Sequence, residues 1–159
     1  GGAHSLTTKQ RRELYTRFFP LADWIDVELR SIKKFSNTVL PEARACGIGI
    51  IVSDHHFRST PPLSALLRRL QSACRAEPDI FKIATRTENA RELGVLLSYI
   101  LRGSRQAIAA MGMGAFGKIS RLLLARAGSI LNYGWLGEPQ VPGQWEATLL
   151  KARIEELGD

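Results

Sequence analysis

The sequence predicts an α/β protein built around a parallel sheet. Short apolar segments alternate with helical segments from about residue 6 to the end of the 159-residue chain. The helical segments are long enough to connect parallel strands by right-handed crossovers. Polar residues that can bind ligands or take part in catalysis follow several of the apolar segments. They lie at the strand ends where ligands bind in such folds. A doubly wound open sheet and a (β/α) barrel both fit, and the alternation alone does not choose between them.

The predicted elements are bounded by residues that start or stop them. Five apolar segments are expected to form strands: 24–29, 47–53, 79–85, 106–112 and 129–135. Six segments are expected to form helices: 7–19, 38–46, 61–77, 88–101, 117–128 and 142–157. Thr7 or Thr8 is the expected cap of the first helix. Thr60 is the expected cap of the third, with Pro61 at its first position.

The composition favours one globular domain over residues 1–159. The chain is 45% hydrophobic and holds no apolar run near the ~20 residues of a membrane span. Its two cysteines lack metal or redox spacing, so we expect them to be reduced in a cytoplasmic protein. The net charge is +7. Because the basic residues are scattered over helical positions, we expect solvated helix faces and a small anionic substrate, with no nucleic acid and no membrane.

Lys82 stands out among the strand residues. It interrupts the apolar segment DIFKIAT on the same side as Ile80 and Ala84. Burial disfavours an ammonium, and the neutral amine of lysine is a nucleophile that forms imines with carbonyl compounds. The alternative is a lysine whose ammonium reaches solvent from the end of a strand.

Two adjacent histidines follow the second predicted strand. In extended backbone they point to opposite faces, so only one of them can face a given site. His55 precedes Lys82 by 27 residues, about one βα unit. Successive strands of a parallel sheet are often neighbours, so His55 and Lys82 can meet over one small ligand.

A glycine pattern offers a different function. Gly112, Gly114 and Gly117 form GxGxxG between a predicted strand and helix, as in dinucleotide-binding folds. The next segment, SILNYGW, carries no acidic residue to bind a ribose, and ordinary loop glycines fit equally well. A nucleotide-binding α/β domain is therefore a weaker alternative.

Five segments in this order resemble type I 3-dehydroquinate dehydratase, a Schiff-base lyase of the shikimate pathway. They are DWIDVEL, IIVSDHHFRSTPP, DIFKIAT, MGMGAFGKISR and GSILNYGWLGEPQVPGQ. Each is weak alone, but together they cover nearly the whole chain with near-family spacing. The resemblance implies a (β/α)₈ barrel, here an incomplete one of about five βα units.

The resemblance also assigns roles by position. Lys82 matches the imine-forming lysine and His55 the general acid/base, with Asp26 expected to orient His55. The substrate is expected to contact Glu28, Arg121, Gln144, Gln140, Met111, Met113 and Tyr133. Two positions depart from the family pattern: His56 replaces an aspartate, and Gln140 stands where a serine of a closing loop is usual.

The implied reaction is the dehydration of 3-dehydroquinate to 3-dehydroshikimate, with no metal and no organic cofactor. The segments that correspond to the family's first three strands are not in this sequence, which opens on Gly1-Gly2. We therefore expect a partial barrel that is completed by an N-terminal segment, with a homodimer as a further expectation. A non-catalytic sensor domain that keeps the barrel is the alternative function.

Overall fold

The computed structural model describes residues 6–139 and 142–158 and contains one parallel sheet. Strands β1 to β4 are Trp24–Glu28, Gly49–His56, Ile80–Arg86 and Ala107–Met113. Helices α1 to α7 are Thr8–Phe18, Ile32–Phe35, Val39–Ala45, Leu63–Cys74, Ala90–Leu101, Gly117–Arg126 and Ala147–Glu156. Two 3₁₀ turns, Phe19–Leu21 and Leu29–Ser31, flank β1. No helix in these residues is long and apolar enough to cross a membrane.

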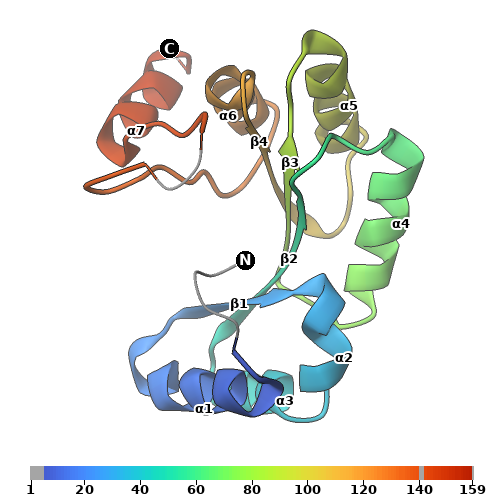
Figure 1. Cartoon of the computed structure of the whole chain (residues 1–159), viewed down its shortest axis with the longest axis vertical. Helices are drawn as coiled ribbons and strands as arrows, with labels where there is room; N and C mark the ends of the chain where they lie inside the picture. The colour runs from blue at the N-terminus through green and yellow to red at the C-terminus, as the bar shows by residue number, and fades with distance from the viewer. Residues whose placement is uncertain (1–5, 140–141, 159) are drawn as a thin grey trace.

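The strand order decides between the two predicted architectures. Each strand pairs in parallel with the next in chain order, β1-β2-β3-β4. The sheet curves, and α4 and α5 follow its outer side (Figure 1). A doubly wound sheet would reverse its strand order and carry helices on both faces. The observed order is that of a (β/α) barrel, and this part of it is open because β1 and β4 do not pair.

The main hydrophobic core lies between the outer face of the sheet and the helices. Val52 and Phe81 point outward from neighbouring strands and are fully buried, together with Leu66 of α4 and Leu96 of α5. These apolar contacts hold each helix against its own strands, and thereby fix the inner face of the sheet.

The inner face carries the alternate residues of each strand. A small apolar layer of Ile51, Ile80 and Ala109 lies near its amino-terminal end. One row above, the register places Glu28 beside Ser53 and Ser53 beside Lys82. The inner face is therefore apolar at its base and polar toward the carboxyl ends of the strands.

The predicted cap of the first helix is confirmed, since Thr7 caps α1 with a capping box to Gln10. Helix α5 begins at Ala90, two residues after the expected start, because Asn89 caps it. The second strand runs further than expected, through both histidines, because His55 pairs with Ala84 of β3. The expected end of this strand at residue 53 is therefore wrong.

The predicted start of α4 is also wrong. The helix begins at Leu63, after both prolines, and has no side-chain cap. The Thr60 hydroxyl lies 2.8 Å from that of Thr85 and 3.1 Å from that of Thr87. The Thr60 hydroxyl, which the sequence predicted to cap the helix, therefore binds residues of the neighbouring strand instead.

The fifth predicted strand, 129–135, is not formed. The Ser129 hydroxyl accepts from the backbone N–H of Ala110 at 2.9 Å, and Ile130 N–H donates to the Ile108 carbonyl at 3.0 Å. A side chain thus takes up part of the edge of β4, and no ladder continues beyond it. The last helix begins at Ala147 instead of Pro142, where Glu146 accepts hydrogen bonds from the first turn.

Candidate active site

An ion pair crosses the inner face of the sheet. Lys82 Nζ on β3 donates to the Asp26 carboxylate on β1, so the pair passes over the intervening strand β2. The Lys82 side chain is only 10% exposed. The sequence alternative of a solvent-reaching lysine is therefore wrong, because the ammonium is held in the interior by a carboxylate.

A histidine–glutamate pair lies beside it. His55 Nδ1 and Glu28 Oε1 are 2.5 Å apart, and both side chains are about one-fifth exposed. Burial raises the pKa of Glu28, but the hydrogen bond and charge of His55, aided by Arg30, outweigh it and lower the pKa below its usual range. Because Glu28 accepts from Nδ1–H, Nε2 is left with a lone pair that can act as a base.

This pairing corrects one expectation. Glu28, and not Asp26, is the carboxylate that orients His55, while Asp26 is the partner of Lys82. The register explains the exchange: Asp26 lies level with Ile51, four residues short of His55, whereas Glu28 lies level with Ser53. Four residues of strand span roughly 13 Å, beyond the reach of an aspartate.

An apolar wall faces the lysine. Ala84, Met111 and Met113 form a buried cluster with Tyr133 packed against it. The Lys82 ammonium lies 4.8 Å from the centre of the Tyr133 ring, a cation–π distance. Burial raises the pKa of Tyr133, partly offset by the Lys82 charge.

Arg121 supplies a second buried cation. This side chain of α6 is 2% exposed. Its guanidinium donates from Nη1 to the Tyr133 carbonyl at 2.9 Å and from Nε to the Gly143 carbonyl at 3.3 Å. Burial lowers its pKa to about 10. Among residues 6–139 and 142–158 no carboxylate forms an ion pair with Arg121, so the site has a fixed positive charge that an anionic ligand can neutralise.

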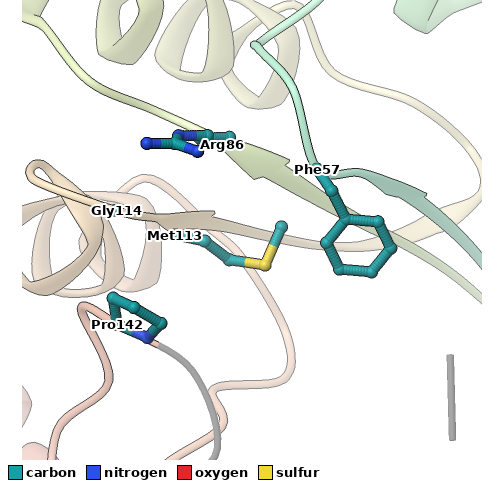
Figure 2. A pocket seen from close by; sticks show the side chains of 5 residues that line it. All are labelled: Phe57, Arg86, Met113, Gly114 and Pro142. Carbon is teal, nitrogen blue, oxygen red and sulfur yellow. The ribbon is translucent and has the colours of Figure 1, made fainter.

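These groups line one cavity of about 200 Å³. Its walls are His55, Phe57, Lys82, Ala84, Met111, Met113, Arg121, Tyr133 and Gln144. A second cavity shares Phe57 and Met113 with it and extends toward Arg86, Gly114 and Pro142 (Figure 2). In that view the Met113 side chain extends toward the Phe57 ring. The catalytic candidates therefore line one of two cavities that meet at Phe57 and Met113.

The structure gathers the candidates that the sequence had dispersed. Those that line the cavity are His55, Lys82, Met111, Met113, Arg121, Tyr133 and Gln144, and Asp26 and Glu28 bind two of them. Gln140 lies outside the described residues. Sequence analysis missed Phe57, whose ring stacks on His55 with centroids 5.8 Å apart and planes 6° apart. The only signal was an aromatic residue directly after the two histidines.

The other histidine belongs to the outer face. His56 Nε2 lies 3.0 Å from Asp54 Oδ2, which also pairs with Arg69 of α4 at 3.3 Å. Neither His56 nor its partners line the cavity. As expected from strand alternation, the two histidines face opposite sides.

The glycine pattern serves packing. A Cβ on Gly112 would lie 2.4 Å from the Ser120 hydroxyl oxygen, and one on Gly117 would lie 2.8 Å from Gly143. Gly114 has φ +82° and faces the Glu88 carboxylate. A carboxylate at this place repels a phosphate, so the nucleotide alternative receives no support. Within the described residues, no three His, Cys, Asp or Glu side chains are grouped as metal ligands.

Lys82 contacts a carboxylate and lies beside a histidine base in a sheet of parallel barrel strands. Enzymes that act through a lysine imine have this arrangement. Comparison with known proteins narrows this class. The model of the family described as type I 3-dehydroquinase matches residues 1–158. The chain therefore belongs to the type I 3-dehydroquinase family, a family of lyases.

Individual relatives support this family assignment. The chain is 33% identical to the 3-dehydroquinate dehydratase of Methanothermobacter thermautotrophicus and 34% identical to that of Thermococcus onnurineus. These alignments cover 99% and 100% of this chain. The crystal structure of the Geobacillus kaustophilus enzyme matches with a TM-score of 0.90 at 25% identity over 99% of this chain. That of Clostridium difficile, with covalent modified comenic acid, has a TM-score of 0.89 at 28% identity over the same share.

The matches cover only part of each relative. The chain spans 68% and 72% of the two curated relatives and 63% and 64% of the two crystal structures. The four-stranded open sheet thus corresponds to about two thirds of a longer dehydroquinase chain.

Proposed function

We propose that the protein is a 3-dehydroquinate dehydratase in which Lys82 forms an imine with the substrate ketone. One observation carries this proposal: the nearly buried Lys82 side chain contacts Asp26 and lines the same cavity as His55, which pairs with Glu28. Nucleophile, proton acceptor and oriented base thus meet at one hollow, which is the set of groups that imine chemistry requires.

The first step needs a neutral amine. The Lys82 ammonium donates to Asp26, so the carboxylate is in place to take its proton. The amine nitrogen then attacks the ketone carbon, and loss of water gives the imine. The protonated imine draws electrons from the neighbouring carbon and so acidifies its C–H bond.

His55 is the base for that C–H bond. Glu28 holds Nδ1–H and stabilises the imidazolium that forms, while Phe57 stacks on the ring and limits its rotation. Nε2 removes the proton and then returns a proton to the departing hydroxyl, as the dehydration requires. Hydrolysis of the imine releases 3-dehydroshikimate and restores the Lys82 amine.

Substrate binding falls to the rest of the cavity. The Arg121 guanidinium, already held by two backbone carbonyls, is suited to pair with the substrate carboxylate. Gln144 lines the same cavity and offers an amide to the substrate hydroxyls. Met111, Met113 and Tyr133 exclude water from the reacting carbons. The net charge of +7 favours the approach of an anion.

Borohydride trapping tests the proposal. The protein is incubated with 3-dehydroquinate and sodium borohydride, digested, and analysed by mass spectrometry. A reduced adduct on Lys82, absent from Lys82→Met, is expected. A sensor domain would bind 3-dehydroquinate in calorimetry without forming the adduct or turning over the substrate, and that result would overturn the lyase assignment.

The remaining expectations stay predictions. They are the absence of an organic cofactor and of nucleic-acid binding, a cytoplasmic location, and the association with a second copy or an N-terminal segment that completes the barrel.

A further inference from the structure

Ser53 occupies a special place under the ion pair. In the register of the sheet it lies between Glu28 on β1 and Lys82 on β3. The contact between Lys82 and Asp26 crosses β2, and Ser53 and Ile51 are the inner-face residues of β2 at this crossing. A small side chain at residue 53 leaves room for the lysine to reach the other side.

The Ser53 hydroxyl is buried. The residue is 1% exposed, and its Oγ makes no hydrogen bond within the described part of the chain. Leaving a buried hydroxyl unpaired costs about 1 to 3 kcal/mol of folding free energy. Alanine would fill the same place without this cost, so a hydroxyl here calls for an explanation outside the resting structure.

We propose that Ser53 is a positioning residue for Lys82, whose hydroxyl binds the lysine nitrogen when that nitrogen is neutral. This inference rests on the proposed imine mechanism. In the ion pair Lys82 is a donor, and Asp26 accepts from it. After the proton moves to Asp26, the amine has two N–H donors and a lone pair, and the Ser53 hydroxyl oxygen can accept one N–H while the lone pair stays free to attack the ketone.

The strand register supports a change of partner for the Lys82 nitrogen, from Asp26 to Ser53. Neighbouring strands lie about 4.8 Å apart, so Ser53 is the nearest polar side chain on the adjoining strand to Lys82. The hydroxyl can also accept from the protonated imine, so it pairs with the nitrogen on both sides of the condensation. By accepting an N–H, it orients the amine without occupying the lone pair that attacks the ketone.

Other charged groups also set the protonation of Lys82. The ionisable side chains that face it or line its cavity are Asp26 and Glu28 from β1, His55 from β2, Arg121 from α6, and Tyr133 from the segment after α6. A change at Ser53 leaves all of them in place, so the pH of the half-maximal rate should stay the same while the rate falls.

The test measures the rate of borohydride-trapped adduct formation with 3-dehydroquinate as a function of pH. For Ser53→Ala we expect a rate about tenfold lower across the pH range with the pH of the half-maximal rate unchanged, because a poorly oriented amine attacks more slowly at the same protonation. The melting temperature should equal or exceed that of the unchanged protein. Thr38→Val is the matched control, because the Thr38 hydroxyl is also buried without a partner but lies at the start of α3.

The outcomes separate this inference from the proposed function. If the unchanged protein forms the adduct and Ser53→Ala matches its rate, or is slower only because its pH midpoint has moved, the role of Ser53 is wrong and the lyase stands. If the unchanged protein forms no adduct, both are wrong. A Ser53→Ala variant that slows only because it unfolds would show a lower melting temperature, which contradicts the expected gain.

Discussion

The two histidines of β2 show how the two faces of one strand differ. His55 on the inner face and His56 on the outer face are each 21% exposed, and each contacts a carboxylate, Glu28 and Asp54 respectively. A histidine–carboxylate pair is therefore not by itself a mark of catalysis in this protein.

The surroundings make the difference. The inner pair shares a cavity with Lys82 and Arg121, whereas the outer pair shares its carboxylate with Arg69 of α4. On the outer face the charges neutralise one another and join helix to strand. On the inner face Lys82, His55 and the Arg121 guanidinium line one cavity. A ligand-sized hollow next to groups of different chemistry distinguishes the active face.

Removal of the inner-face nucleophile should have the largest effect. Lys82→Met should lower kcat with 3-dehydroquinate by roughly 10⁴-fold or more, the scale seen when a covalent nucleophile is removed. Lys118→Met is the control, because Lys118 lies over the Trp145 ring away from the cavity. The absorbance of the enone product measures the rates of both variants. A Lys82→Met variant with more than about a tenth of the original rate would show that no imine is needed.

Paired alanine substitutions compare the faces directly. His55→Ala should lower kcat by about 10²- to 10⁴-fold, the usual contribution of a general acid/base, while the trapped adduct on Lys82 still forms. His56→Ala should change kcat by less than about threefold and instead lower the melting temperature, because Asp54 loses a partner. Equal losses of kcat in the two variants would contradict the division between faces.

Substitutions of the two inner-face carboxylates should have different effects on adduct formation and on kcat. Asp26→Asn should slow adduct formation by about tenfold or more, because the amide cannot take the lysine proton. Glu28→Gln should leave adduct formation nearly unchanged and lower kcat by about tenfold, because an amide stabilises the imidazolium less well. The reverse pattern would return Asp26 to the role of orienting His55.

Glu28 should also appear in the acid stability of the protein. Its pKa is lowered in the fold, mainly because His55 outweighs the opposing effect of burial. A carboxyl group of this kind adds stability above its ordinary pKa and loses that contribution as the pH falls through its lowered value. Glu28→Gln should therefore cost roughly 1 kcal/mol in urea unfolding at pH 7 and less near pH 3. An equal cost at both pH values would indicate that the charge contributes nothing.

Strand alternation predicted which residues share a face, because that pattern is set by neighbours in the chain. It placed Lys82 on the same side as Ile80 and Ala84 and separated His55 from His56, as the structure has them. Alternation does not fix how far one strand is shifted along the next. The exchange of partners between the two carboxylates came from that register, which depends on packing across the sheet.

Sequence reasoning was weakest where distant residues replace local signals. Ser129 binds β4 through its side chain, so an apolar segment that looks like a strand forms no ladder. Phe57 belongs to the site because its ring stacks on His55, a contact that neither periodicity nor spacing reveals. The cavity lining could be predicted from strand ends, since every parallel strand delivers its carboxyl end to the same rim.

Thr60 provides the smallest and most local comparison. Its hydroxyl donates to or accepts from Thr85 and Thr87, behind the inner-face residues Ala84 and Arg86. Thr60→Val keeps the shape and removes these bonds, so the free energy of unfolding should fall by about 1 kcal/mol. Ser59→Ala, one residue earlier, is the control. Because the three hydroxyls join the loop before α4 to the carboxyl end of β3, amide exchange in Thr60→Val should rise at both segments. A rise confined to α4 would instead restore Thr60 as a helix cap, since a cap protects only the helix that it begins.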